Sequence, residues 1–251
     1  MMANAKWSFG DRVVVITGSA TGMGAGAVNS FAAAGATVYG IDIDGDGGTA
    51  VADRSGTTFL NCDITSSSAV REAFAQIESE QGRVDVLINN AGGFWEQNTT
   101  ESLTEGEWDR VIDLNLKAVF LCAQSSIPLL RKSSAGRIIS IASLAGQTAM
   151  YRSSPPYAAA KAAVLSLTRV LAFELAEEAI TANALSPSAV MTDRIKVVRS
   201  EEERTKTATT IPLGHYGEVD DIVAWMMFLA SEESGFMTGE TINVNGGRFM
   251  V

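Results

Sequence analysis

The stretch Arg12–Gly24, RVVVITGSATGMG, decides the fold of this chain. Its first half is an apolar run of mostly β-branched residues, which is typical of a strand covered on both faces. Its second half is a glycine-rich turn that opens a helical pattern. Glycines suit such a turn because side chains would hold a pyrophosphate away from the backbone N–H groups. A glycine-rich loop alone is weak support, but its position directly after a first strand indicates a dinucleotide site at the helix N-terminus.

Strand-like apolar runs and amphipathic runs alternate along the rest of the chain. Such alternation is typical of a doubly wound parallel sheet with helices on both faces. The expected strands are Arg12–Thr17, Thr37–Asp42, Thr57–Asn61, Val84–Asn89, Arg137–Ala142, Ile180–Leu185 and Thr241–Val244. The clearest expected helices are Ser66–Gln81, Glu107–Leu130, Tyr157–Glu177 and Val219–Ala230. We therefore predict an α/β fold with a Rossmann sheet of about seven strands.

No linker, repeat or low-complexity segment divides the 251 residues, so a single domain over residues 1–251 is expected. The polar and charged segment Arg194–Thr210 lies between a predicted strand and the last helix. We interpret it as a helical excursion from the core, and residues 188–212 as a lid over the substrate.

The composition limits the partners. A net charge of -10 repels phosphate backbones and anionic lipid headgroups, which argues against nucleic acid and against a membrane surface. The first residues lack the apolar centre of a secretory signal, and the apolar stretch Ala118–Leu130 is too short to span a bilayer. A soluble intracellular protein is expected, which in bacteria means a protein of the cytoplasm. Cys62 and Cys122 lie in apolar runs without metal-site spacing, so they are interpreted as buried hydrophobic residues and no metal is expected.

Asp42 ends the second predicted strand, 24 residues after Gly18. A carboxylate at this point can accept both hydroxyls of an adenosine ribose, and it would repel a 2′-phosphate. The residues that would attract such a phosphate, an Arg or a Lys at Thr21 or Ile43, are absent. NAD is therefore expected in preference to NADP. The alternative interpretation of Asp42 is a solvated aspartate in a loop.

The acidic residues of this segment also have the spacing of a calcium-binding loop. The spacing runs through Asp42, Asp44, Asp46, Gly47 and Asp53. The context argues against calcium because a strand, not a helix, precedes the run. Asp44 and Asp46 are instead interpreted as an acidic turn.

Tyr157 and Lys161 lie four residues apart, in the sequence YAAAK, at the start of a helical pattern. This spacing places the phenol and the ammonium on one helix face. A neighbouring cation favours the phenolate and lowers the pKa of a tyrosine from its usual value of about 10, as a general acid/base for a carbonyl oxygen requires. The pair alone is common on exposed helices, so its meaning depends on the rest of the chain.

An ordered set of motifs supplies that context, because through it the chain resembles the short-chain dehydrogenase/reductase family from end to end, in its compact single-domain branch. The motifs are Thr17–Gly24, Asp42, Asp63, Asn89–Gly92, Asn115, Ser143, Tyr157 with Lys161, Pro187 to Thr192, and Asn245–Gly247. The resemblance implies an NAD-dependent oxidoreductase that moves a hydride between nicotinamide and the carbon of a secondary alcohol or ketone. Two alternatives on the same fold are an NAD-binding sensor without chemistry and a non-redox enzyme, such as a dehydratase or an epimerase, that retains NAD.

The resemblance implies four catalytic residues. Tyr157 would exchange a proton with the substrate oxygen, and Lys161 would tune Tyr157 and hold the nicotinamide ribose. Ser143 would hydrogen-bond the substrate oxygen and stabilise its developing charge. Asn115 would hold a water that links Lys161 to solvent. The structural alternatives are a turn hydroxyl for Ser143 and a polar helix face for Asn115.

The resemblance also implies a cofactor site. Asp63 would contact the adenine with Ile64 as its backbone neighbour, and Thr192 would hold the nicotinamide carboxamide. The full expected set is Gly18, Thr21, Gly22, Met23, Gly24, Asp42, Ile43, Asp63, Ile64, Asn90, Ala91, Gly92, Tyr157, Lys161, Pro187, Val190 and Thr192.

Two positions depart from the family pattern. Ser188 follows Pro187 where the family usually has glycine, and serine would cost backbone freedom if φ there were positive. Ser143 and Tyr157 are also one residue farther apart than is common in the family. The segment Tyr151–Pro156 is expected to absorb the extra residue as a stiff loop at the pocket mouth.

The resemblance places the substrate pocket at Gly93–Trp95, Leu144–Arg152 and the residues from Val190 onward. Its apolar walls would be Phe94, Trp95, Met150, Tyr151 and Met191, which favours a cyclic or medium-sized hydrophobic alcohol or ketone. The nearby cations Arg152, Arg194, Lys196 and Arg199 have two interpretations, recognition of an anionic group or a solvated charged helix.

Two remaining expectations concern assembly and the single histidine. The family commonly forms tetramers through two long helices, here Glu107–Leu130 and Tyr157–Glu177, so a homotetramer is expected. The second helix is strongly apolar, which fits burial on more than one side. His215 lies beyond the expected lid and is interpreted as a structural or surface residue.

Overall fold

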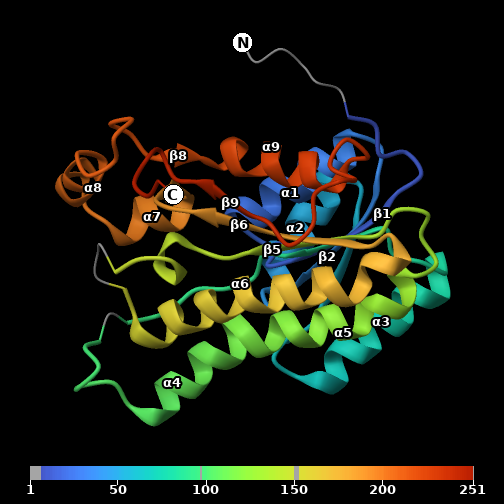
Figure 1. The fold of residues 1–251 in the computed structure, drawn as a ribbon, viewed down its shortest axis with the longest axis horizontal. Coiled ribbons are helices and arrows are strands. Elements are labelled where there is room, and N and C mark those ends of the chain that lie inside the picture. The colour runs from blue at the N-terminus through green and yellow to red at the C-terminus, as the bar shows by residue number, and fades with distance from the viewer. Residues whose placement is uncertain (1–6, 97, 150–152, 251) are drawn as a thin grey trace.

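Seven parallel strands form one sheet in the order β3-β2-β1-β4-β5-β6-β9 (Figure 1). The structure is a computed structural model that describes residues 7–96, 98–149 and 153–250. The strands are β1 (Val13–Thr17), β2 (Thr37–Asp42), β3 (Thr58–Asn61), β4 (Val86–Asn89), β5 (Arg137–Ile141), β6 (Thr181–Pro187) and β9 (Thr241–Val244). The predicted α/β fold and its seven strands are confirmed, each strand within two residues of its predicted bounds.

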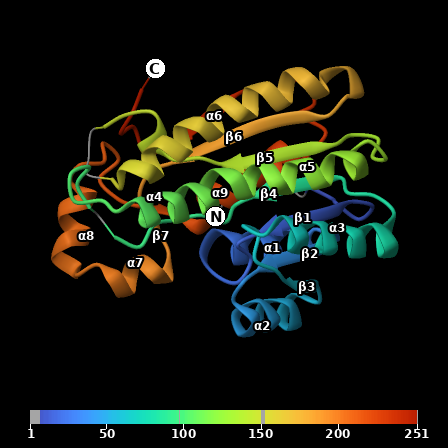
Figure 2. The same cartoon turned by 90° about the horizontal axis from the view of Figure 1, so that it is seen from below.

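Helices cover both faces of this sheet (Figures 1 and 2). The helices beside the sheet are α1 (Gly22–Ala33), α2 (Gly45–Ser55), α3 (Ser67–Gln81), α4 (Glu105–Ile112), α5 (Ala118–Leu130), α6 (Pro155–Leu175) and α9 (Val219–Ala230). Successive side chains of β1 point to opposite faces of the sheet. Val14 and Ile16 pack with α1, α2 and α9 on one face. Val13 and Val15 pack with α3, α5 and α6 on the other. The continuous apolar runs of the strands therefore reflect burial on both sides.

The short helix α2 is a correction to the sequence analysis. Asp44, interpreted there as part of an acidic turn, is the N-cap of α2, and its carboxylate accepts the Gly47 N–H at 3.0 Å. Asp46 lies in the first helical turn, where a negative charge is favoured by the helix dipole. The glycines at 45, 47 and 48 hid this helix because glycine is a poor helix former.

The long helix expected over Glu107–Leu130 is interrupted. A π-helical turn, η1 (Asp113–Lys117), lies between α4 and α5. Asn115 sits in this turn, fully buried, and its amide donates to the carbonyl of Val111 at 2.9 Å and to the carbonyl of Gly93 at 2.7 Å. Such π turns often occur at functional sites because they redirect one side chain.

The segment after β6 leaves the sheet and carries two helices, α7 (Asp193–Val198) and α8 (Glu201–Ala208). They lie beyond the carboxyl edge of the sheet, at the left in Figure 1. The small sheet of β7 (Val190–Met191) and β8 (Gly217–Glu218) joins the two ends of this excursion. Ser188 has no positive φ, and its hydroxyl donates to the carbonyl of Asn245 at 3.1 Å. The backbone cost that serine would have carried here therefore does not arise.

Candidate active site

The strand order reverses between β1 and β4, so their carboxyl ends open a crevice, the usual ligand position in an open α/β sheet. The glycine loop fills one side of it. Gly18 has φ +69°, and a Cβ there would lie 2.8 Å from the Cα of Ala91. A Cβ on Gly24 would lie 1.8 Å from the carbonyl oxygen of Gly18. Only glycine allows the turn to pack this closely against the end of β4 and the start of α1.

Asn90 ties the glycine loop to the end of β4. Its side-chain amide donates to the carbonyls of Thr17 and Gly18 at 3.0 and 3.1 Å, and the backbone N–H groups of Asn90 and Ala91 donate to the Thr17 hydroxyl at 3.1 Å each. Within the described residues, the buried Oδ1 of Asn90 and Nδ2 of Asn89 have no hydrogen-bond partner. Buried polar atoms are normally satisfied, so these two atoms fit a site that a ligand completes.

Asp42 lies half-buried at the end of β2, facing the same crevice. Its Oδ2 accepts the backbone N–H of Ala20 at 2.9 Å and its Oδ1 accepts that of Asp44 at 3.0 Å. These bonds fix the carboxylate next to the glycine loop and leave further acceptor positions on both oxygens. Ile43 is 71% exposed, which suits a residue that covers a planar group.

Other members of the expected cofactor set contribute in different ways. The carboxylate of Asp63 accepts from the N–H and the hydroxyl of Thr65, and Asp63 stays exposed. Ile64 and Val190 are buried in the core, so only their backbone groups face a ligand. Thr192 caps α7, and its methyl carbon lies 3.4 Å from where a Cβ on Gly22 would be. The start of α7 therefore faces the glycine loop across the crevice.

The remaining members surround these residues. Thr21 is exposed at the N-cap of α1, Met23 packs against the core, and Pro187 ends β6 buried. Together the features fit a dinucleotide with its phosphates on the glycine loop.

Lys161 is the most unusual charged residue of the site. It lies on α6 with 2% of its surface exposed, and its Nζ donates to the carbonyl of Ile141 at 2.7 Å. Burial lowers the pKa of this ammonium to about 8. A Cβ on Gly92 would lie 3.0 Å from this Nζ and 2.6 Å from the Oδ1 of Asn115, so the backbone after β4 passes against both residues.

Tyr157 stands one helical turn before Lys161, near the N-terminus of α6. The Nζ of Lys161 lies 5.7 Å from the centre of the tyrosine ring. On its other side the ring packs on Phe94, with the two ring centres 4.9 Å apart. Pro155 and Pro156 occupy the first helical turn, where their fixed φ favours helix initiation. The structure thus brings phenol and ammonium together at the carboxyl edge of the sheet.

Ser143 follows β5 and caps the 3-10 turn η2 (Leu144–Gly146), its hydroxyl accepting the Ala145 N–H at 3.2 Å. This turn is pressed against α6, since a Cβ on Gly146 would lie 2.6 Å from the backbone N of Ala162. Ser143 is therefore fixed beside the helix that carries Tyr157. Gly146 lies in the expected pocket segment Leu144–Arg152, but its packing role was not predicted, although a glycine three residues after the expected catalytic serine is a signal of close backbone approach.

Gln147, in the same expected pocket segment, has a structural role that was not predicted. Its amide nitrogen lies 2.6 Å from the Ser186 hydroxyl and 2.6 Å from the Asn243 Oδ1, which ties the turn after Ser143 to β6 and β9. Nothing in the local sequence pointed to this role, because its partners are 39 and 96 residues away.

Asn115 hydrogen-bonds the backbone of the loop after β4. Its Oδ1 accepts the Gly93 N–H at 2.9 Å, while both amide hydrogens go to backbone carbonyls. The side chain thus braces Gly93, and one further acceptor position on Oδ1 remains for the expected water.

The expected pocket walls are only partly placed as predicted. Phe94 contacts Tyr157, but Trp95 turns away and stacks beneath Arg110, whose guanidinium carbon lies 3.8 Å from the ring centre. Leu144 and Ala145 are buried in the core and do not line a pocket. Met191 is half-buried in β7. Met150, Tyr151 and Arg152 lie outside the described residues.

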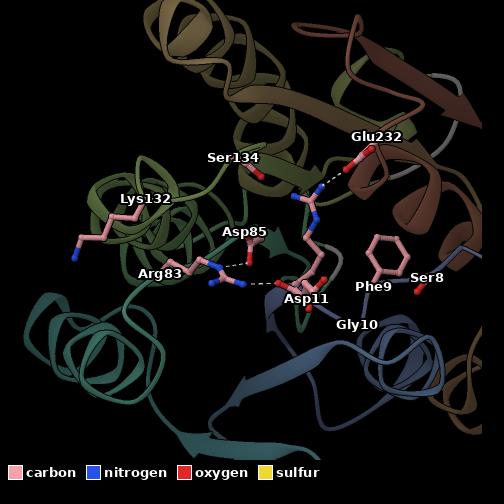
Figure 3. A pocket seen from close by; sticks show the side chains of 10 residues that line it. Ser8, Phe9, Gly10, Asp11, Arg83, Asp85, Lys132, Ser134 and Glu232 are labelled. Atoms are coloured by element: carbon pink, nitrogen blue, oxygen red, sulfur yellow. Dashed lines mark hydrogen bonds and ion pairs between the residues drawn. The ribbon is translucent and has the colours of Figure 1, made fainter.

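A hollow of about 520 Å³ lies at the opposite, amino edge of the sheet (Figure 3). Its cations are engaged with carboxylates, Arg12 with Glu232 and Arg83 with Asp85. It holds none of the expected site residues and is far from the crevice, so we assign the chemistry to the carboxyl edge.

Other features bear on metals, membranes and the histidine. In the described ranges, no cluster of three or more His, Cys, Asp or Glu side chains is arranged to hold a metal. Among the same residues, no helix has both the length and the apolar character needed to cross a membrane. His215 is exposed, and its Nδ1 lies 2.7 Å from the Tyr216 carbonyl.

Comparison with known proteins agrees with this geometry. Residues 18–248 match a family model described as enoyl-(acyl carrier protein) reductase. The chain is 33% identical over 246 residues to the 3-oxoacyl-[acyl-carrier-protein] reductase FabG of Escherichia coli, covering 97% of this chain and 100% of the relative. It is 38% identical over 248 residues to the (2S)-[(R)-hydroxy(phenyl)methyl]succinyl-CoA dehydrogenase subunit BbsD of Thauera aromatica, covering 95% and 96% of the two chains.

A solved structure shares the whole fold. It is the active-site complex of Pseudomonas aeruginosa RhlG with NADP, with a TM-score of 0.92, 29% identity and coverage of 98% and 99% of the two chains. A nicotinamide cofactor is accordingly expected in the crevice. The chain therefore belongs to the short-chain dehydrogenase/reductase family, as an oxidoreductase that acts on ketones or alcohols.

Proposed function

We propose that this protein is an NAD-dependent dehydrogenase or ketoreductase that acts on a small secondary alcohol or ketone, with Tyr157 as the general acid/base. The observation that carries the proposal is the buried Lys161 beside Tyr157. A lysine with 2% exposure and a carbonyl as its hydrogen-bond acceptor costs stability, and it is explained by chemistry at the neighbouring phenol.

In the direction of oxidation, the Tyr157 phenolate takes the proton of the substrate hydroxyl. Nicotinamide, when bound, would supply the redox chemistry, which is hydride exchange with the carbinol carbon. The ammonium of Lys161 stabilises the phenolate and holds the ribose hydroxyls. Ser143 donates to the substrate oxygen, with its own orientation set by the Ala145 N–H.

Asp42 supports NAD over NADP. Its carboxylate is held next to the glycine loop by two backbone N–H groups, and a 2′-phosphate at this place would meet a negative charge. The structurally similar RhlG was solved with NADP, so the preference of this chain has to be tested directly.

Assembly as a homotetramer is part of the proposal. The helices α5 and α6 lie side by side on one face of the sheet (Figure 2). They leave large apolar side chains at the surface, with Phe120, Val170 and Phe173 exposed by 46%, 47% and 88%. Large apolar side chains exposed on two neighbouring helices support an interaction surface there. A monomeric mass in sedimentation would contradict this assembly.

The test is the absorbance of reduced nicotinamide with the full chain, NAD or NADP, and a panel of secondary alcohols and ketones. We expect turnover with NAD in preference to NADP, and a loss of about 100-fold to 10,000-fold in kcat for Tyr157→Phe with NAD affinity retained. Tight NAD binding without turnover of any member would support the sensor. Conversion of substrate with no net redox change would support the dehydratase or epimerase.

A further inference from the structure

The cations of the expected lid differ in their hydrogen-bond and ion-pair partners. Lys196 pairs with Asp193 at 2.9 Å on the outer side of α7. Arg199 donates to the Thr207 hydroxyl at 3.2 Å, within the lid itself. Arg194 behaves differently, because its Nη2 donates across to the carbonyl of Phe94, 100 residues earlier, at 2.9 Å. Among the described cations of this segment, only Arg194 is shown to reach from the expected lid to the loop after β4.

The position of Arg194 relates it directly to the catalytic residues. A Cβ on Gly93 would lie 3.3 Å from its Nη1, and Gly93 is the residue that Asn115 holds by both backbone groups. Phe94, which accepts from Arg194, packs its ring on Tyr157. The guanidinium therefore lies against Gly93 and Phe94, the two residues through which Asn115 and Tyr157 contact this loop.

The guanidinium has donors to spare. Within the described part of the chain, Arg194 has no carboxylate partner, and its one hydrogen bond uses a single N–H of five. A guanidinium binds a carboxylate with two parallel N–H groups, which gives both energy and orientation. Because Phe94 places an apolar ring beside Tyr157, such a contact would add a polar determinant of the substrate on this side of the site.

We propose that Arg194 determines specificity, binding a carboxylate of the substrate a few bonds from the carbon whose oxygen meets Tyr157. The substrate class is then an oxo acid or hydroxy acid. This proposal rests on the proposed oxidoreductase function. The carboxylate would lie beside Phe94, whose carbonyl accepts from Arg194 and whose ring packs on Tyr157.

The experiment compares the kcat/KM of matched substrates, 3-oxobutanoate and 3-oxohexanoate against their methyl esters, with reduced nicotinamide as the readout. For Arg194→Met we expect a fall of about 10-fold to 100-fold with the acids and less than about twofold change with the esters. Lys196→Met is the matched control, since it removes one cation from the same helix, and it should change neither. Arg194→Lys should restore part of the loss, mainly through KM.

Several outcomes would overturn the assignment. One is wild-type enzyme that prefers the esters. Another is an Arg194→Met variant that loses acids and esters equally, which would make Arg194 a brace of the loop. A third is loss of NADH affinity in that variant, which would place Arg194 in the cofactor site. Turnover of no panel member would instead count against the proposed function. The affinity of the acids for the enzyme–NADH complex, measured by calorimetry in wild type and both Met variants, then tests the role of Arg194 without turnover. Weaker binding in Arg194→Met but not in Lys196→Met supports the assignment, and equal binding in all three contradicts it.

Discussion

The two edges of the sheet treat buried polar groups in opposite ways. At the amino edge, Asp85 is 3% exposed but accepts from the Val13 N–H at 2.8 Å, from Arg83 and from the Ser133 hydroxyl. At the carboxyl edge, Lys161 is equally buried with a carbonyl acceptor and no carboxylate partner among the described residues. Charges at the amino edge serve the fold, whereas those at the carboxyl edge are left for a ligand.

The largest expected effect comes from removing the carboxyl-edge charge. Lys161→Met should lower kcat at least about 100-fold, because the phenolate loses its cation. The same change should stabilise the cofactor-free protein at pH 7. The folded-state pKa of about 8 lies below the usual lysine value of 10.5, so protonated Lys161 costs folding free energy below pH 8, on the order of 3 kcal/mol.

The sign of the pH dependence follows from that shift. Between pH 8 and 10.5 the unfolded chain binds more protons than the folded one, so the wild type gains stability as the pH rises. The advantage of Lys161→Met in Tm should shrink over this interval. Thermal unfolding at several pH values checks it, and an advantage independent of pH would contradict the desolvation argument.

Removing the amino-edge charge should give the converse result. Asp85→Ala leaves the Val13 N–H and the Nε of Arg83 without their acceptor, so we expect a loss of about 2–4 kcal/mol in unfolding free energy. The kcat/KM per folded molecule should stay within about twofold. Urea unfolding combined with steady-state kinetics measures both, and a catalytic defect without a loss of stability would abolish the distinction between the edges.

A smaller effect is expected at the cofactor carboxylate. Asp42→Asn should weaken NAD binding about 10-fold, through the loss of a charge-assisted bond to the ribose, and should reduce the preference over NADP. Asp46→Asn is the matched control, because Asp46 is an exposed acid on the adjoining helix α2. Calorimetric titration with both cofactors distinguishes them. Equal effects of the two variants would show only a general change in surface charge.

The smallest effect is expected at an exposed pair near the amino edge. Lys132 and Glu78 lie 2.7 Å apart, but about half of each side chain is exposed. Lys132→Met should therefore change the unfolding free energy by less than about 1 kcal/mol and leave catalysis unchanged. The same urea and kinetic measurements apply, and a loss as large as that of Asp85→Ala would mean that burial does not separate the two sites.

Much of the fold could be predicted because strand signals are local. Continuous apolar runs such as Val13–Thr17 carry their own evidence of two-sided burial. The helix α2 and the turn η1 could not be predicted in this way. Glycine-rich α2 forms because Asp44 caps it and its Val51 is buried, and η1 depends on bonds from Asn115 to a distant loop.

The site residues likewise divide into those with a local sequence signal and those that depend on tertiary contacts. Tyr157, Lys161, Ser143 and Asn115 were predicted from spacing and resemblance, and the structure brings them to one edge of the sheet. The orientation of Trp95 and the burial of Leu144 depend on tertiary packing that spacing does not encode. The contact of Arg194 with Phe94 joins residues 100 positions apart, so nothing in the sequence distinguished it from Lys196.

The π-helical turn η1 also sets the rotation of α5 about the helix axis relative to α4. An α-helix turns by about 100° per residue, so deleting one residue from Asp113–Lys117 would leave a regular helix but rotate α5 relative to α4 by that angle. Either Asn115 would leave Gly93, or buried residues of α5 such as Cys122 would turn toward solvent. The number of residues in η1 is therefore fixed by two requirements. Asn115 must face Gly93 in the active site, and the apolar residues of α5 must face the hydrophobic core.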